Sequence, residues 1–196
     1  MTGTTLFILW TATRTIGFAA YATAFLCCGI AWLWAMRYCG KQDGFARLAL
    51  MVATVELLLS FDMVFEWRLT FHTLLANLFM KHNLYGQRRW FQGASLLVLG
   101  AALLFFLASV FRRLRARPGG LMAVGGLSMS VTLWLTEIIS MHDVDMSLYH
   151  TVNDVMVIAF LWAALCTVTI LGVGIDAGRA VRQVEPELAG HDEGCD

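Results

Sequence analysis

The sequence has little charge and little proline. Charged residues make up 14% of its 196 residues, whereas a soluble domain carries about 25%. Only two prolines interrupt the chain, which leaves room for long helices. Basic and acidic residues number 14 each, so the formal net charge is zero and no basic surface indicates binding to nucleic acid. The composition therefore argues against both a soluble domain and a nucleic-acid-binding protein.

The common enzyme motifs are also missing. There is no P-loop, no GxGxxG after a strand, no GxSxG and no HExxH. The five cysteines have neither CxxC nor zinc-ligand spacing, so we expect them to be packing residues or free thiols. Residues 1–13 contain no Lys or Arg, which a secretory signal would need, so we expect the first apolar segment to be retained as a helix.

Hydrophobic residues, by contrast, make up 59% of the chain and gather in long runs. Crossing the hydrocarbon layer of a membrane takes about 20 apolar residues. Five stretches are suitable, at 16–36, 48–65, 91–110, 121–139 and 152–175. The sequence therefore predicts an all-α, polytopic transmembrane helical bundle with about five spans, or four as the alternative. Residues 1–182 would form a single transmembrane domain with an external connection at 66–90, and the acidic segment 183–196 would be a disordered cytoplasmic tail.

Lys and Arg predict the orientation. Nine of the fourteen follow the first, third and fifth spans, which five crossings would put on the same side: Arg37, Lys41, Arg47, Arg112, Arg113, Arg115, Arg117, Arg179 and Arg182. Such residues favour the cytoplasmic side. We therefore expect a multi-pass protein of the cell inner (plasma) membrane, with its N-terminus outside and its C-terminus in the cytoplasm.

Acidic residues and histidines gather at the opposite, outward-facing helix ends. The polar pocket expected there comprises Asp62, Glu66, Arg68, His72, His82, Arg88, Arg89, Glu137, His142, Asp143, Asp145, Tyr149, His150 and Asp154. Ionisable groups beside hydrocarbon are costly and tend to mark function. The densest part is 137–154. If the fifth helix starts near residue 143, one of its faces holds Asp143, His150 and Asp154, and another holds His142, Asp145 and Tyr149. Otherwise the acids of this segment cap the helix.

Two arrangements of this pocket are open. In the first, carboxylates and histidines hold a transition metal such as iron, manganese, zinc or copper, with Glu66, Glu137, His142 and His150 as candidate ligands. Heme fits less well, because no histidine lies deep within a span. In the second, the acids form ion pairs with Arg68, Arg88 and Arg89 and close the mouth of the bundle as a salt-bridged lid.

Glu56 is the most informative single candidate residue, because it falls near the middle of the second span. A charged carboxylate at such a depth costs about 2.5–3.5 kcal/mol. We therefore expect Glu56 to face the bundle and to be protonated or paired, with hydroxyl partners available at Thr54, Ser128, Ser130 and Thr132. It is either a neutral hydrogen-bonding residue or a proton- or ion-binding one.

The leading functional hypothesis is an integral inner-membrane protein whose outward polar pocket serves a larger membrane complex, as a subunit or a small-molecule-handling partner. A membrane-embedded, metal-dependent oxidoreductase or hydrolase is the first alternative, and a proton-coupled transporter that uses Glu56 is the second. The expected partners are the lipid bilayer and other membrane subunits or further copies of this chain.

Overall fold

The structure is a computed structural model that describes residues 3–38, 44–81, 88–139, 148–152 and 155–189. Within these ranges the helices are α1 (Gly3–Tyr38), α2 (Gly44–Phe65), α3 (Trp67–Lys81), α4 (Arg88–Leu114), α5 (Pro118–Ile139) and α7 (Val157–Ala189). Two short strands, β1 (Thr151–Val152) and β2 (Val155–Met156), pair antiparallel. All the helices except α3 contain a segment long and apolar enough to cross a membrane. The predicted all-α bundle with five spans is confirmed.

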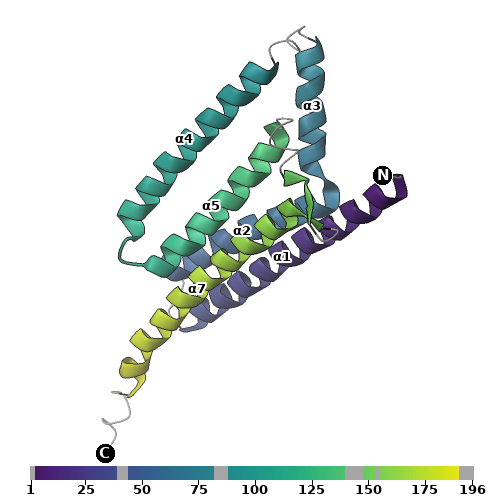
Figure 1. Ribbon diagram of the computed structural model, residues 1–196. Helices are drawn as coiled ribbons and strands as arrows, with labels where there is room; N and C mark the ends of the chain where they lie inside the picture. The colour runs from purple at the N-terminus through teal and green to yellow at the C-terminus, as the bar shows by residue number, and fades with distance from the viewer. Residues whose placement is uncertain (1–2, 39–43, 82–87, 140–147, 153–154, 190–196) are drawn as a thin grey trace, which may run out of the picture.

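Four of the spans form the body of the molecule, and α4 lies outside it (Figure 1). Helix α1 packs along α2 and α7, and α5 packs along α7. Helix α4 has α5 as its main neighbour, and none of its most apolar stretch is buried. Helix α3 leaves the body at an angle and leads the chain towards α4.

Small residues bring α5 and α7 close together. A Cβ atom on Gly126 of α5 would lie 2.6 Å from Oγ1 of Thr169, and one on Gly172 of α7 would meet the backbone of Ala123. Real Cβ contacts are not that short, so only glycine fits at these two positions. Close backbone approach is how helices associate in lipid, where burial of apolar surface provides no driving force.

The second span ends at Glu66, where the chain turns sharply into α3. Glu66 has a positive φ of 55°, the left-handed conformation that commonly ends a helix. Its N–H donates to the carbonyl of Asp62 at 2.8 Å. Because the helix breaks here, α2 alone makes the crossing and α3 is a separate helix. We call this end of the bundle, where α2 and α5 end and α3 begins, the α3 end.

The expected start of the fifth helix is wrong. The sequence predicted a span from residue 152, or a helix that starts near residue 143. Helix α7 instead begins at Val157, and the two short strands lie before it. The registers are Thr151 with Met156 and Val152 with Val155. β-branched residues such as Thr151, Val152 and Val155 fit strands well. Tyr149 and His150 are therefore not part of α7, and the other residues of the two predicted helical faces lie outside the described residues.

The other end of α7 also differs from the expectation. The helix continues to Ala189, so it includes the first residues of the segment predicted to be a disordered tail. Several residues there, among them Glu185, Glu187 and Leu188, have good intrinsic helix propensity.

Candidate functional site

The candidate site is centred on Arg68, in the first turn of α3. Its side chain is only 1% exposed, although α3 itself leaves the bundle. The residue is buried because its guanidinium group reaches back to residues from four other helices. A fully buried arginine requires compensation for its lost hydration, and the structure provides it with carboxylates and with aromatic rings.

Two acids form ion pairs with Arg68. Nη1 of Arg68 lies 3.0 Å from Oε2 of Glu137, the acid near the end of α5. Nε lies 3.8 Å from Oδ2 of Asp62 in α2, and the backbone N–H of Arg68 donates to Oδ1 of the same aspartate at 2.9 Å. The carboxylate of Asp62 therefore caps the start of α3 and also compensates the charge of Arg68. Both acid side chains are 2% exposed.

Tryptophan rings complete the surroundings of the guanidinium. Its central carbon lies 4.9 Å from the ring centroid of Trp162 in α7 and 5.9 Å from that of Trp10 in α1. Both distances allow attraction between a cation and an aromatic face. Trp162 fits here because α1 has a glycine opposite it, since a Cβ on Gly17 would lie 2.5 Å from the indole ring.

A second arginine, Arg14 of α1, contacts the end of α2. Arg14 donates hydrogen bonds from Nε (3.1 Å) and Nη2 (2.7 Å) to the carbonyl of Met63, and from Nη2 to that of Val64 at 3.2 Å. Its Nη1 forms an ion pair with Glu66. These are carbonyls of the last turn of α2, which lack helical partners. Arg14 thus caps α2, a role the sequence did not reveal.

Glu56 lies deeper, in the middle of α2, and is completely buried. The thiol of Cys166 in α7 donates to its Oε2 at 3.8 Å, whereas Oε1 has no hydrogen-bond partner among the described residues. The expected hydroxyl partners do not serve it: Thr54, Ser128 and Thr132 each donate to their own helix, and the buried hydroxyl of Ser130 has no hydrogen-bond partner among the described residues. Hydroxyls bond readily to the carbonyl four residues earlier in a helix. Cys166, expected to be only a packing residue or free thiol, is therefore part of the Glu56 environment.

Tyr21 of α1 lies between Glu56 and the cluster of Arg68, Asp62 and Glu137. It is 1% exposed and within electrostatic reach of Glu56, Glu137 and Arg68. On α7, Trp162, Cys166 and Thr169 are all buried, and their spacing of four and three residues puts them on one face. Buried polar and aromatic groups therefore connect the level of Glu56 with the Arg68 cluster.

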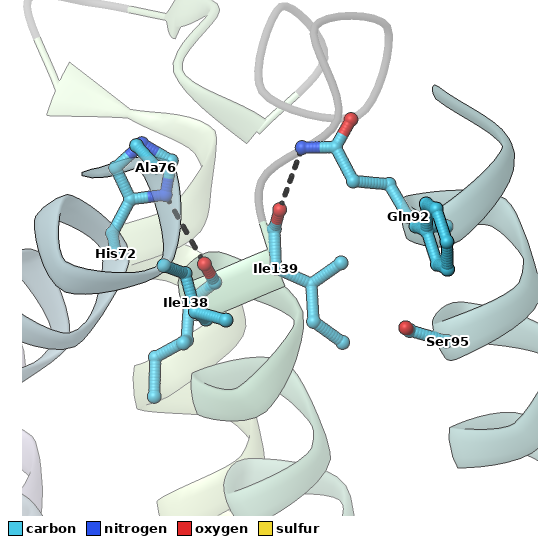
Figure 2. A pocket seen from close by; sticks show the side chains of 8 residues that line it. His72, Ala76, Gln92, Ser95, Ile138 and Ile139 are labelled. Atoms are coloured by element: carbon cyan, nitrogen blue, oxygen red, sulfur yellow. Dashed lines mark hydrogen bonds between the residues drawn. The ribbon is translucent and has the colours of Figure 1, made fainter. Parts of the chain in front are cut away.

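His72 and Gln92 have a structural role beside this cluster (Figure 2). Nδ1 of His72 in α3 lies 3.1 Å from the carbonyl of Ile138, and Nε2 of Gln92 in α4 donates to the carbonyl of Ile139 at 2.9 Å. The last carbonyls of α5 have no partners within the helix. The two side chains therefore cap α5 and tie α3 and α4 to it. A cavity of about 100 Å³ lies between them, lined mainly by apolar groups such as Leu75.

The predicted pocket is brought together only in part. Its described side chains are those of Asp62, Glu66, Arg68, His72, Glu137, Tyr149 and His150. His82, His142, Asp143, Asp145 and Asp154 lie outside the described residues, as do the side chains of Arg88 and Arg89. Asp62, Arg68 and Glu137 meet, whereas Glu66 pairs with Arg14. Tyr149 packs against Trp10, with ring centroids 6.0 Å apart, and His150 is exposed.

The candidate metal ligands do not form a group in the part of the chain that can be described. There, no three His, Cys, Asp or Glu side chains are close enough together to hold a metal ion. Glu66 and Glu137 each face an arginine, which weakens the attraction of a carboxylate for a cation. A transition-metal site that includes His142 stays a prediction.

No protein-family model matches this chain, and neither a curated protein nor a solved structure does. The fold and the site define its class. It is a polytopic α-helical membrane protein with a buried arginine–carboxylate cluster at one end of the bundle and a buried glutamate at mid-depth.

Proposed function

We propose that this protein carries protons through its helical bundle, with Glu56 as the proton-binding residue. The observation that supports the proposal is an excess of buried acids. Among the described residues Glu56, Asp62 and Glu137 are buried between the middle of the bundle and the α3 end, and the buried cation there is Arg68. Three negative charges against one positive leave a formal excess of two. In a membrane interior such an excess must be compensated by protons or cations.

Glu56 is suited to bind and release a proton. One of its oxygens accepts from Cys166, and the other has no hydrogen-bond partner in the part of the chain that the structure describes, so a proton on Oε1 would remove the charge without breaking a described hydrogen bond. The thiol is a weak donor and stabilises the ionised form only slightly. Weak stabilisation of the ionised form favours the binding of a proton, which is the first step that a proton carrier requires.

The Arg68 cluster is suited to be the exchange point at the α3 end. Its two carboxylates share one guanidinium, so a proton on either acid would leave a balanced pair. Tyr21 lies within electrostatic reach of both Glu56 and this cluster and has a hydroxyl group that can donate and accept.

The test measures protonation and transport separately. Infrared difference spectra of the purified protein over a pH series should show the C=O band of a protonated carboxyl that Glu56→Gln removes. Vesicles containing the protein and a pH-sensitive dye should take up protons under an imposed gradient. We expect Glu56→Gln to abolish this uptake. Glu66→Gln is the matched control, because it is the same chemical change at a partly exposed acid that follows the same helix.

Wild-type proton uptake by Glu56→Gln would refute the proposal, as would a carboxyl band that this variant leaves unchanged. Loss of uptake in Glu56→Gln and Glu66→Gln alike would point to damaged folding. A thermal melt of each variant distinguishes that case, since Glu56→Gln preserves the size and hydrogen-bonding capacity of the side chain and should melt close to the wild type.

A second candidate function, a subunit of a membrane complex, is favoured by α4. This helix has the highest mean hydropathy of the five spans, 2.5, and none of that stretch is buried. Its large side chains Leu97, Leu104 and Phe105 are about 70% exposed. A partner helix could cover this face, with lipid covering it otherwise. Cysteines introduced at these positions and cross-linked in intact membranes would give discrete larger products for a subunit and none for an isolated chain.

A further inference from the structure

We propose that the end of the bundle opposite the α3 end holds a binding site for the headgroup of an acidic phospholipid. A cavity of about 430 Å³ lies there, within the range of small-ligand sites. It is formed where the short connection between α4 and α5 meets the start of α2 and the later turns of α7 (Figure 1). Its charged lining residues are Arg117, Asp176, Arg179 and Arg182.

Three guanidinium groups line this cavity without an acidic partner. None of Arg117, Arg179 and Arg182 takes part in an ion pair within the described part of the chain, and all three side chains are exposed. Arginine is well suited to phosphate, because its planar group donates parallel hydrogen bonds to two oxygens. Basic pockets between spans near a membrane surface favour anionic headgroups.

Asp176 does not cancel this positive charge. Its carboxylate is buried, with the residue 6% exposed, and lies against the start of α5, where Cβ atoms on Gly119 and Gly120 would come within 2.5 and 3.0 Å of its oxygens. There it faces the positive end of the α5 dipole. Even counted in full, three arginines and one aspartate leave a formal charge of +2 on the lining.

The position of the cavity favours a lipid over a soluble phosphate. The arginines lie at the ends of spans, because Arg117 directly precedes α5, which begins at Pro118, and the α7 span ends at Arg182. The cavity therefore lies at the depth of the headgroups. Phe45 at the start of α2 and Ala180 on α7 add apolar lining, which suits a glycerol backbone and the first carbons of acyl chains.

The experiment measures lipid binding to the purified full chain in detergent by native mass spectrometry. Phosphatidylglycerol is compared with phosphatidylcholine of the same acyl chains and with glycerophosphate as the soluble source. We expect a single phosphatidylglycerol to bind more tightly than either. Arg179→Gln and Arg182→Gln should each weaken it about fivefold, from the roughly 1 kcal/mol that one basic residue contributes at an anionic surface. Arg37→Gln, an exposed arginine at the end of α1 outside the cavity, should leave binding unchanged.

Asp176→Asn should change the affinity in the opposite direction, because removal of the carboxylate raises the positive charge of the lining. We expect it to strengthen binding of phosphatidylglycerol. Equal affinities for phosphatidylglycerol and phosphatidylcholine would overturn the proposal, as would equal losses in Arg37→Gln and Arg182→Gln. Glycerophosphate that binds as tightly as phosphatidylglycerol would show a site for soluble phosphate and overturn the lipid assignment. The arginine variants change exposed side chains, so they should fold even if Asp176→Asn does not.

Discussion

Replacing Arg68 by methionine tests whether the buried cluster at the α3 end holds the bundle together. The change keeps most of the side-chain volume and removes the charge. It leaves Glu137 and Asp62 buried without their cation, and both are 2% exposed. Breaking a buried ion pair from one side costs about 3–5 kcal/mol. The contact of the guanidinium with Trp162 is lost as well.

The expected size of the effect follows from the length of the chain. For 150–250 residues, 1 kcal/mol shifts Tm by about 2–4 °C, so Arg68→Met should lower Tm by roughly 6–20 °C. The assay is thermal unfolding in detergent, followed by a thiol-reactive dye that reports exposure of Cys28 and Cys166, both buried in the folded protein.

A rescue separates loss of charge balance from loss of shape. Neutralising the acids as well, with Asp62→Asn and Glu137→Gln added to Arg68→Met, removes the uncompensated charges. The triple variant should recover a large part of the lost Tm, since uncharged groups of the same size are cheaper to bury than lone charges. Arg68→Met at wild-type Tm would refute the reasoning, as would a triple variant less stable than the single one.

Three further predictions concern other parts of the fold. Gly172→Ala should destabilise the bundle, because its Cβ would meet the backbone of α5, whereas Gly174→Ala two residues on meets open space and should be neutral or stabilising by up to about 1 kcal/mol; thermal melts compare the two. Glu56→Lys should reduce the amount of protein inserted into membranes, since it places a cation at mid-span; normal abundance and Tm would show that residue 56 faces water. In intact cells, a thiol reagent should label a cysteine introduced near Asn83 and spare one near Gln42; the reverse pattern would overturn the expected orientation.

Local information in the sequence determined the spans. Whether a helix can cross a membrane depends on the length and hydropathy of a continuous segment, and both can be read directly from the chain. The same applies to burial of Glu56, because any residue in the middle of a span must face lipid or the bundle, and lipid is too costly for an acid. The limit of this reasoning appeared at residues 151–156, where two short strands precede α7. Their pairing depends on contacts with each other, not on hydropathy.

The tertiary structure alone decided which charges meet. Glu56 contacts Cys166, which is 110 residues away in the sequence. Arg68 forms ion pairs with the nearby Asp62 and also with the distant Glu137 of α5. Arg14 caps α2 from a different helix, and His72, a candidate pocket residue, caps α5. Each pairing depends on how the spans are rotated and how deeply they sit against one another. Hydropathy sets the position of a span in the membrane but not its neighbours, because lipid accepts every apolar face equally. Close contacts at Gly17, Gly126 and Gly172 fix these rotations, and only the folded bundle shows which surfaces they bring together.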